Sequence, residues 1–126
     1  MMKRVVICDD QLHVVTPLRI KFTKAGYDAV IAHDGQEAWQ EIQECIPDLL
    51  VTDLCMPEMD GYELVKRLRS NPATKHIPVV LLTGVSLDTM RREVIEELDI
   101  TEVIPKPYSA KAVLRAAERV IAAVSM

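Results

Sequence analysis

Apolar runs of strand length alternate five times with segments of helical periodicity along the chain. Runs of β-branched and aliphatic residues predict strands, whereas apolar residues that recur every three or four positions predict helices. The predicted strands cover residues 4–8, 27–32, 49–52, 77–82 and 101–105. The predicted helices cover residues 12–25, 36–45, a segment that begins at Gly61, residues 87–98, and a last segment that follows Ser109 and ends near Val124.

Local signals mark several of the helix boundaries. Gly26 closes the first predicted helix, and Ser86 and Ser109 are suitable N-caps for the fourth and fifth. Pro17 falls within the first helical segment, and a proline is tolerated in a first turn but kinks a helix at later positions.

Strands that alternate with helices predict right-handed crossovers and a parallel sheet with both faces covered, which is the α/β class. In such sheets ligands bind at the carboxyl ends of the strands, where the strand order reverses. Polar residues stand at these ends in four of the five predicted strands: Asp9, Asp10, Asp53, Thr83 and Lys106. A single polar residue after a strand is commonly an ordinary loop residue, but the five together predict one shared site.

Three aspartates close together favour the binding of a divalent cation. Two carboxylates 4 Å apart repel by about 4 kcal/mol at an effective dielectric constant near 20, so a bound cation and Lys106 would be needed to compensate. Hard oxygen ligands with room for water suit Mg²⁺. One carboxylate could then attack phosphorus, and Thr83 with the N–H group of Gly84 could donate to a phosphoryl oxygen.

These residues, the segment Asp53-Leu54-Cys55-Met56-Pro57-Glu58-Met59-Asp60-Gly61 and the pair Lys106-Pro107 strongly resemble the response-regulator receiver domain of two-component signalling. The resemblance runs from Arg4 to the last helix. It implies a flavodoxin-like (βα)5 doubly wound parallel sheet of strand order 2-1-3-4-5. We expect residues 1–126 to form a single receiver domain.

The resemblance also implies a role for each site residue. Asp53 would accept a phosphoryl group from the phosphohistidine of a sensor histidine kinase or phosphotransfer protein. Asp10, Asp53 and the main-chain carbonyl of Cys55 would bind Mg²⁺, with Asp9 acting through water. Lys106 would pair with the acyl phosphate, Thr83 and Gly84 would respond to it, and the peptide bond between Lys106 and Pro107 would be cis.

Three positions depart from the family pattern. Val103 stands where many receivers carry a Tyr or Phe that moves together with the threonine. Asp99 and Ile100 replace a common Gly-Ala pair, so the preceding turn is expected to be built differently. Cys55 follows the acceptor by two positions and has little capacity to orient water, so we expect no help with hydrolysis from it.

The function implied is a phosphorylation-controlled switch that changes its affinity for a downstream protein through the face of the fourth helix, fifth strand and fifth helix. It would catalyse only its own phosphorylation and dephosphorylation. One alternative is a receiver-like binding module that phosphorylation does not regulate. Another is an aspartate-nucleophile phosphatase, but Cys55 occupies the place of its general acid and the chain leaves no room for a cap domain.

The amino-acid composition of the chain limits the classes of partner that we expect it to bind. The 126 residues carry a net charge of −4 and include one Trp, one Phe and three Tyr, which disfavours direct binding of nucleic acid. No apolar run approaches bilayer length and no signal-peptide pattern opens the chain, so we expect a cytoplasmic protein without membrane contact. Cys8, Cys45 and Cys55 form no CxxC pair and are expected to be reduced thiols, the first two as core residues.

Overall fold

The computed structural model describes residues 2–54, 59–84, 92–105 and 108–125. The strands are β1 (Arg4–Cys8), β2 (Asp28–Ala32), β3 (Leu49–Asp53), β4 (Val79–Thr83) and β5 (Glu102–Pro105). The helices are α1 (Leu12–Lys24), α2 (Gly35–Glu44), α3 (Gly61–Ser70), α4 (Arg92–Glu97) and α5 (Ala110–Ser125). Within the described ranges, no helix combines the length and apolar character needed to cross a bilayer.

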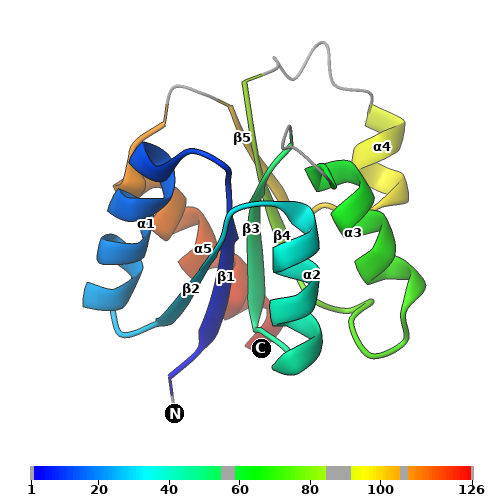
Figure 1. Cartoon of the computed structure of the whole chain (residues 1–126), viewed down its shortest axis with the longest axis horizontal. Coiled ribbons are helices and arrows are strands. Elements are labelled where there is room, and N and C mark those ends of the chain that lie inside the picture. The colour runs from blue at the N-terminus through cyan, green and yellow to red at the C-terminus, as the bar shows by residue number, and fades with distance from the viewer. Residues whose placement is uncertain (1, 55–58, 85–91, 106–107, 126) are drawn as a thin grey trace.

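All the strand pairs are parallel, and the sheet has the order β2-β1-β3-β4-β5. Helices α1 and α5 cover one face, and α2, α3 and α4 cover the other (Figure 1). The chain order reverses next to β1, because β2 lies on one side of it and β3 on the other. The fold predicted from the sequence is therefore confirmed, including its strand order.

Burial of the three central strands explains why this arrangement is stable. Every residue of β3 and β4 is buried, and so are four of the five residues of β1. Successive residues point to opposite faces, so Val5 and Ile7 pack with Phe22 beneath α1 and α5, while Val6 packs with Leu64 beneath the other helices. A parallel sheet covered on both faces accounts for the near-continuous apolar runs.

The fourth strand begins two residues later than its apolar run predicts. Proline has no N–H group to donate to a neighbouring strand, and β4 starts directly after Pro78 at Val79. The carbonyl of Pro78 still accepts a hydrogen bond from the Leu50 N–H at 3.0 Å, and Ile77 is buried although it lies outside the strand. A prediction from apolar character alone therefore begins this strand two residues too early.

Three local predictions have different outcomes. Ser109 caps α5, since its Oγ accepts from the Ala112 N–H at 3.1 Å. Pro17 lies inside α1, beyond its first turn. Cys45 is exposed at the end of α2, so the prediction that it is a core residue is wrong, because the helix that buries Ala38 and Ile42 ends there and Cys45 has an extended backbone. The predicted start of the fourth helix and its cap at Ser86 lie outside the described residues.

The turn after α4 is built on Asp99, which adopts a left-handed backbone with φ of 51°. The N–H of Ile100 closes the helix end by donating to the carbonyl of Ile95 at 3.0 Å. The Arg69 guanidinium on α3 donates to the carbonyls of Leu98 and Asp99 at 2.7 and 3.1 Å. Arg69 also donates to the carbonyls of Lys75 and Ile77, both at 2.7 Å. Non-local hydrogen bonds therefore hold a turn that glycine would form without strain.

Replacing Asp99 tests this backbone strain. Glycine adopts the left-handed region freely, whereas alanine is strained there and lacks the short polar side chain of aspartate. We expect Asp99→Gly to melt about 4 °C above Asp99→Ala, a difference of about 1 kcal/mol. Thermal unfolding followed by circular dichroism measures the difference, and equal melting temperatures would contradict the assignment.

Candidate functional site

Three carboxylates meet at the carboxyl edge of the sheet. Asp9 and Asp10 follow β1, Asp53 ends β3, and one oxygen from each of the three side chains lies within 4.8 Å of the others. Asp9 is fully buried, Asp53 is 7% exposed, and Asp10 is open to solvent. The sequence predicts a shared site of five residues, and the structure brings these three carboxylates of it together.

Main-chain hydrogen bonds fix the positions of these carboxylates. The N–H of Asp9 donates to the carbonyl of Ala32 at 3.1 Å, which extends the pairing of β1 with β2 by one residue. Oδ1 of Asp9 accepts from the N–H of Gln11 at 3.0 Å. The N–H of Leu54 donates to the carbonyl of Leu82 at 3.0 Å, so pairing with β4 continues beyond Asp53. The acidic side chains are thus held by strands rather than by free loops.

Two glycines bring neighbouring backbone close to Asp53. A Cβ atom at Gly61 would collide with the Asp53 carbonyl oxygen, and the Gly61 N–H donates to the Leu54 carbonyl at 2.9 Å. A Cβ atom at Gly35 would collide with the backbone of Met59, whose carbonyl accepts from the Gly35 N–H at 3.0 Å. Both ends of the segment that follows Asp53 are therefore fastened, one to α3 and the other to α2.

The remaining predicted site residues lie on neighbouring strands or outside the described ranges. Thr83 is buried at the end of β4, where it pairs with Pro105, and Gly84 follows it on the exposed side. Val103 on β5 is partly buried against the cluster under α2, α3 and α4, and it pairs with Leu81. Cys55, Lys106 and Pro107 lie outside the described residues, as does the predicted cis bond.

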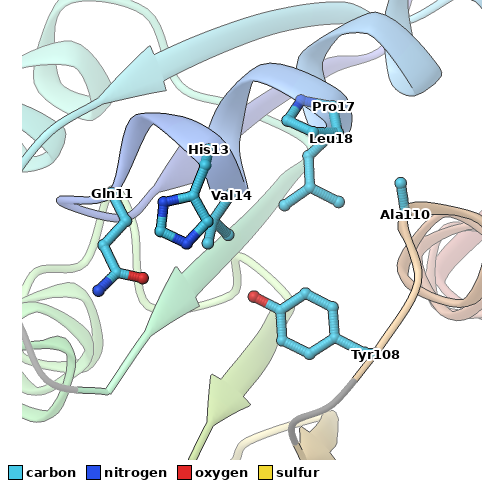
Figure 2. Close-up of a pocket in the computed structure, with 7 residues that line it drawn as sticks. All are labelled: Gln11, His13, Val14, Pro17, Leu18, Tyr108 and Ala110. Atoms are coloured by element: carbon cyan, nitrogen blue, oxygen red, sulfur yellow. The ribbon is translucent and has the colours of Figure 1, made fainter.

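Tyr108 is a site neighbour that the sequence analysis did not single out. Its hydroxyl is buried, has no hydrogen-bond partner among the described residues, and faces the pocket shown in Figure 2. Burial raises the pKa of the Tyr108 hydroxyl, and the charges of Asp9 and Asp53 raise it further. Its place just after the fifth strand was a usable signal, because the same edge carries the other site residues.

Cys8 lies directly behind the acidic cluster but belongs to the core. Its thiol is fully buried and donates to the Asp34 carbonyl at 3.3 Å. Desolvation, followed by smaller contributions from nearby acidic side chains, raises the pKa of Cys8 to about 12. Cys8 is thus a neutral packing residue at neutral pH and not a nucleophile, as its position in an apolar run predicts.

The donor set suits magnesium. All three side chains offer hard carboxylate oxygens, which Mg²⁺ prefers over softer ligands. Mg²⁺ holds its ligands at about 2.0–2.1 Å, so oxygens on opposite sides of the ion lie about 4 Å apart. The separations of up to 4.8 Å approach that span, and the exposure of Asp10 leaves access for water ligands.

Comparison with known proteins agrees with the fold. A family model described as "Response regulator receiver domain" matches residues 5–118, so the chain belongs to this family. It is 33% identical to the alkaline phosphatase synthesis transcriptional regulatory protein PhoP of Bacillus subtilis, over 94% of this chain and 51% of that protein. The chain thus spans about half the length of this curated relative.

Solved structures with the same fold include the chemotaxis response regulator CheY4 of Vibrio cholerae. The TM-score is 0.87 at 28% identity, with 95% of this chain and 99% of that chain covered. The receiver domain of sensor histidine kinase PA1611 from Pseudomonas aeruginosa, solved with magnesium in its active site cleft, shares the fold at a TM-score of 0.85 and 20% identity, covering 97% of this chain and 99% of that chain. The chain is therefore a receiver domain of two-component signalling, a family of phosphorylation-dependent switches that are generally not enzymes.

Removing one negative charge tests the repulsion within the acidic cluster. We expect Asp10→Asn to raise the melting temperature of the metal-free protein by about 4 °C, or about 1 kcal/mol, because the remaining carboxylates repel less. Added Mg²⁺ should then raise the melting temperature of the wild type but not of the variant.

Glu118→Gln is the matched control, since it removes the same charge from an exposed position on α5. Both variants are measured without metal. If Asp10→Asn melts no higher than this control, the predicted repulsion within the acidic cluster is contradicted.

Proposed function

We propose that this chain is a signalling switch in which Asp53 accepts a phosphoryl group from the phosphohistidine of a sensor histidine kinase or phosphotransfer protein. Phosphorylation would change the affinity of the domain for a downstream protein. The observation that carries the proposal is the placement of Asp53, which ends a central strand with Asp9 and Asp10 beside it. Membership in the receiver family supports the same assignment.

Each residue of the site would have a separate role in phosphoryl transfer. An oxygen of Asp53 is the nucleophile, and the residue keeps 7% of its surface exposed to solvent. Asp10, Asp53 and the carbonyl of Cys55 would hold Mg²⁺, with Asp9 acting through water. When bound, the ion supplies positive charge that reduces repulsion between the carboxylate and the incoming phosphoryl oxygens. Lys106 would pair with the phosphoryl group from the end of β5.

The change in the domain would begin at Thr83. Its buried hydroxyl lies at the end of β4, next to the strand that carries Asp53, and Gly84 gives the backbone freedom to move. Val103 cannot relay this movement as an aromatic ring would, since a β-branched side chain is stiff at χ1. The signal would therefore pass through the backbone after Gly84 to the face formed by α4, β5 and α5.

The acceptor assignment is tested with small phosphodonors. Wild-type protein incubated with phosphoramidate and Mg²⁺ should gain one acid-labile phosphoryl group, because Asp53 alone combines the nucleophile with a flanking metal site. Asp53→Asn should gain none while it keeps the same circular dichroism spectrum. Mass measurement of the intact protein records both results, and EDTA should abolish labelling.

Undiminished labelling of the Asp53→Asn variant would contradict the assignment of Asp53 as the phosphoryl acceptor. Release of many phosphates per chain from a phosphate ester would instead favour the aspartate-nucleophile phosphatase considered above.

The route of the signal is tested by two substitutions of the switch residues. Thr83→Ala should still accept phosphate but lose most of the phosphorylation-dependent change in partner affinity, because the hydroxyl that responds to the acyl phosphate is gone. Val103→Ala should leave that change nearly intact. Binding of the phosphorylated and unphosphorylated forms to an identified partner measures the difference. The opposite pattern of losses would show that the signal passes through position 103.

A further inference from the structure

The strand β2 forms one edge of the sheet, and one side of its backbone has no neighbouring strand within the described residues (Figure 1). The Asp28 N–H donates at 2.8 Å and the Ala32 carbonyl accepts at 3.1 Å, in hydrogen bonds to the residues just before and just after β1. Successive residues of a strand direct their N–H and C=O groups to opposite sides. The N–H and C=O groups of Ala29 and Ile31 therefore point away from β1, toward the free edge.

A groove of about 430 Å³ lies beside this edge, between β2 and the outward side of α1. Ile20 is 51% exposed there, although it is a large apolar side chain. The side chains of Ala29 and Ile31 lie on the same face of the sheet as the groove, since both pack against the cluster beneath α1 and α5. A strand added to this edge would therefore direct every second side chain into the groove. The lining residues are Thr16, Arg19, Ile20, Thr23, Lys24 and Ile31.

The charged side chains that line the groove are both positive. Arg19 and Lys24 are exposed, and neither forms an ion pair with another residue in the described part of the chain. Asp28, the carboxylate on β2, belongs to the opposite face of the sheet, where it lies 3.9 Å from Arg4. A positive groove on a chain of net charge −4 favours an acidic partner, because complementary charges attract across an interface.

The spacing of the two cations suits alternate residues of an extended chain. Lys24 follows Arg19 by five residues, which corresponds to about 7.5 Å along the helix axis. Side chains on the same face of a strand are about 6.7 Å apart. Two acidic residues separated by one other residue can therefore pair with both cations at once, while their methylene groups cover Ile20.

A second copy of this chain fits the same edge less well. Antiparallel pairing of two β2 strands would place the α1 helices of both copies side by side on one face of a continuous sheet. Arg19 and Lys24 of one copy would then lie close to the same cations of the other, and like charges across an interface are unfavourable. Basic side chains at a sheet edge commonly prevent self-association in this way. The charges therefore favour a different, acidic protein.

We propose that the free edge of β2 is a docking site for an extended acidic segment of a partner protein, which adds to the sheet as a sixth strand. The main chain of this segment would pair with the outward N–H and C=O groups of Ala29 and Ile31. Two of its acidic side chains, at alternate positions, would contact Arg19 and Lys24. The site lies at the opposite edge of the sheet from β5, and the proposal is independent of the assignment of Asp53 as the phosphoryl acceptor.

Binding of a synthetic peptide tests the proposal. The probe is the acetylated and amidated peptide Thr-Val-Glu-Ile-Glu-Val-Thr, whose two glutamates share one face when the chain is extended. We expect it to shift the NMR signals of the Ala29 and Ile31 amides in the isotopically labelled protein, and the titration gives the Kd. Added salt should weaken binding, because exposed ion pairs are screened.

Two further peptides control for charge and for spacing. A peptide with lysine in place of both glutamates should bind at least tenfold more weakly, because it repels the cations of the groove. The peptide Thr-Val-Glu-Glu-Ile-Val-Thr has the same composition but places its glutamates on opposite faces, so it should bind about threefold to tenfold more weakly.

Protein variants separate the charges from the backbone edge. Arg19→Glu and Lys24→Glu should each weaken binding of the probe about threefold to tenfold, since each replaces an attraction at the surface by a repulsion. Arg115→Glu makes the same charge change at an exposed position on α5 and should leave the Kd nearly unchanged. Ala29→Pro removes an outward N–H group but no hydrogen bond to β1, so it should weaken binding at least tenfold. Circular dichroism checks that each variant keeps the fold.

Absence of shifts at the Ala29 and Ile31 amides would overturn the inference, and so would equal weakening by Arg19→Glu and the control Arg115→Glu. These charge variants decide the question even if Ala29→Pro does not fold. Equal binding of the lysine peptide would overturn the acidic partner. A dimer in sedimentation velocity that Ala29→Pro dissociates would show that a second copy occupies the edge, which would likewise overturn the proposal.

Discussion

Pairing between β1 and β3 sets Cys8 opposite Thr52, and this register brings the carboxylates that follow the two strands to the same edge of the sheet. Their mutual repulsion is the constraint to which the rest of the site responds. The backbone N–H of Gln11 offsets part of the charge on Asp9, and the exposure of Asp10 leaves room for a cation. The sheet thus holds together a group of like charges whose repulsion a bound cation would reduce.

Close backbone packing keeps this edge rigid where the chain leaves the strands. Gly61 and Gly35 allow α3 and α2 to approach the ends of the segment after Asp53 more closely than any residue with a Cβ would permit. These two helices are also parts of the core, since Leu64 and Ile42 pack in one cluster. Burial of apolar surface therefore contributes directly to the geometry of the carboxylate edge.

Local patterns predict the parallel sheet, and one topological rule predicts the acidic cluster at its carboxyl edge, whereas the strand order is predicted by the resemblance to the receiver family. The sequence mislocates the ends of two elements, and it misses a feature that depends on contacts distant in sequence. The start of β4 is set by a missing N–H at Pro78, and the exposure of Cys45 by the end of a helix. The burial of the Tyr108 hydroxyl, which has no hydrogen-bond partner among the residues that the structure describes, depends on the packing of α1 against α5, which no periodicity shows.

Arg69 brings together carbonyl groups from two separate parts of the chain, residues 75–77 and 98–99. A guanidinium can do this because its N–H groups form a rigid planar fork, which a lysine ammonium cannot imitate. Arg69 consequently joins the final turn of α3 to the approach to β4 and to the carboxyl end of α4, at the edge of the sheet opposite the acidic cluster. A rearrangement that starts at Thr83 would reach α4 from its amino end, so the helix would pivot about the end that Arg69 holds.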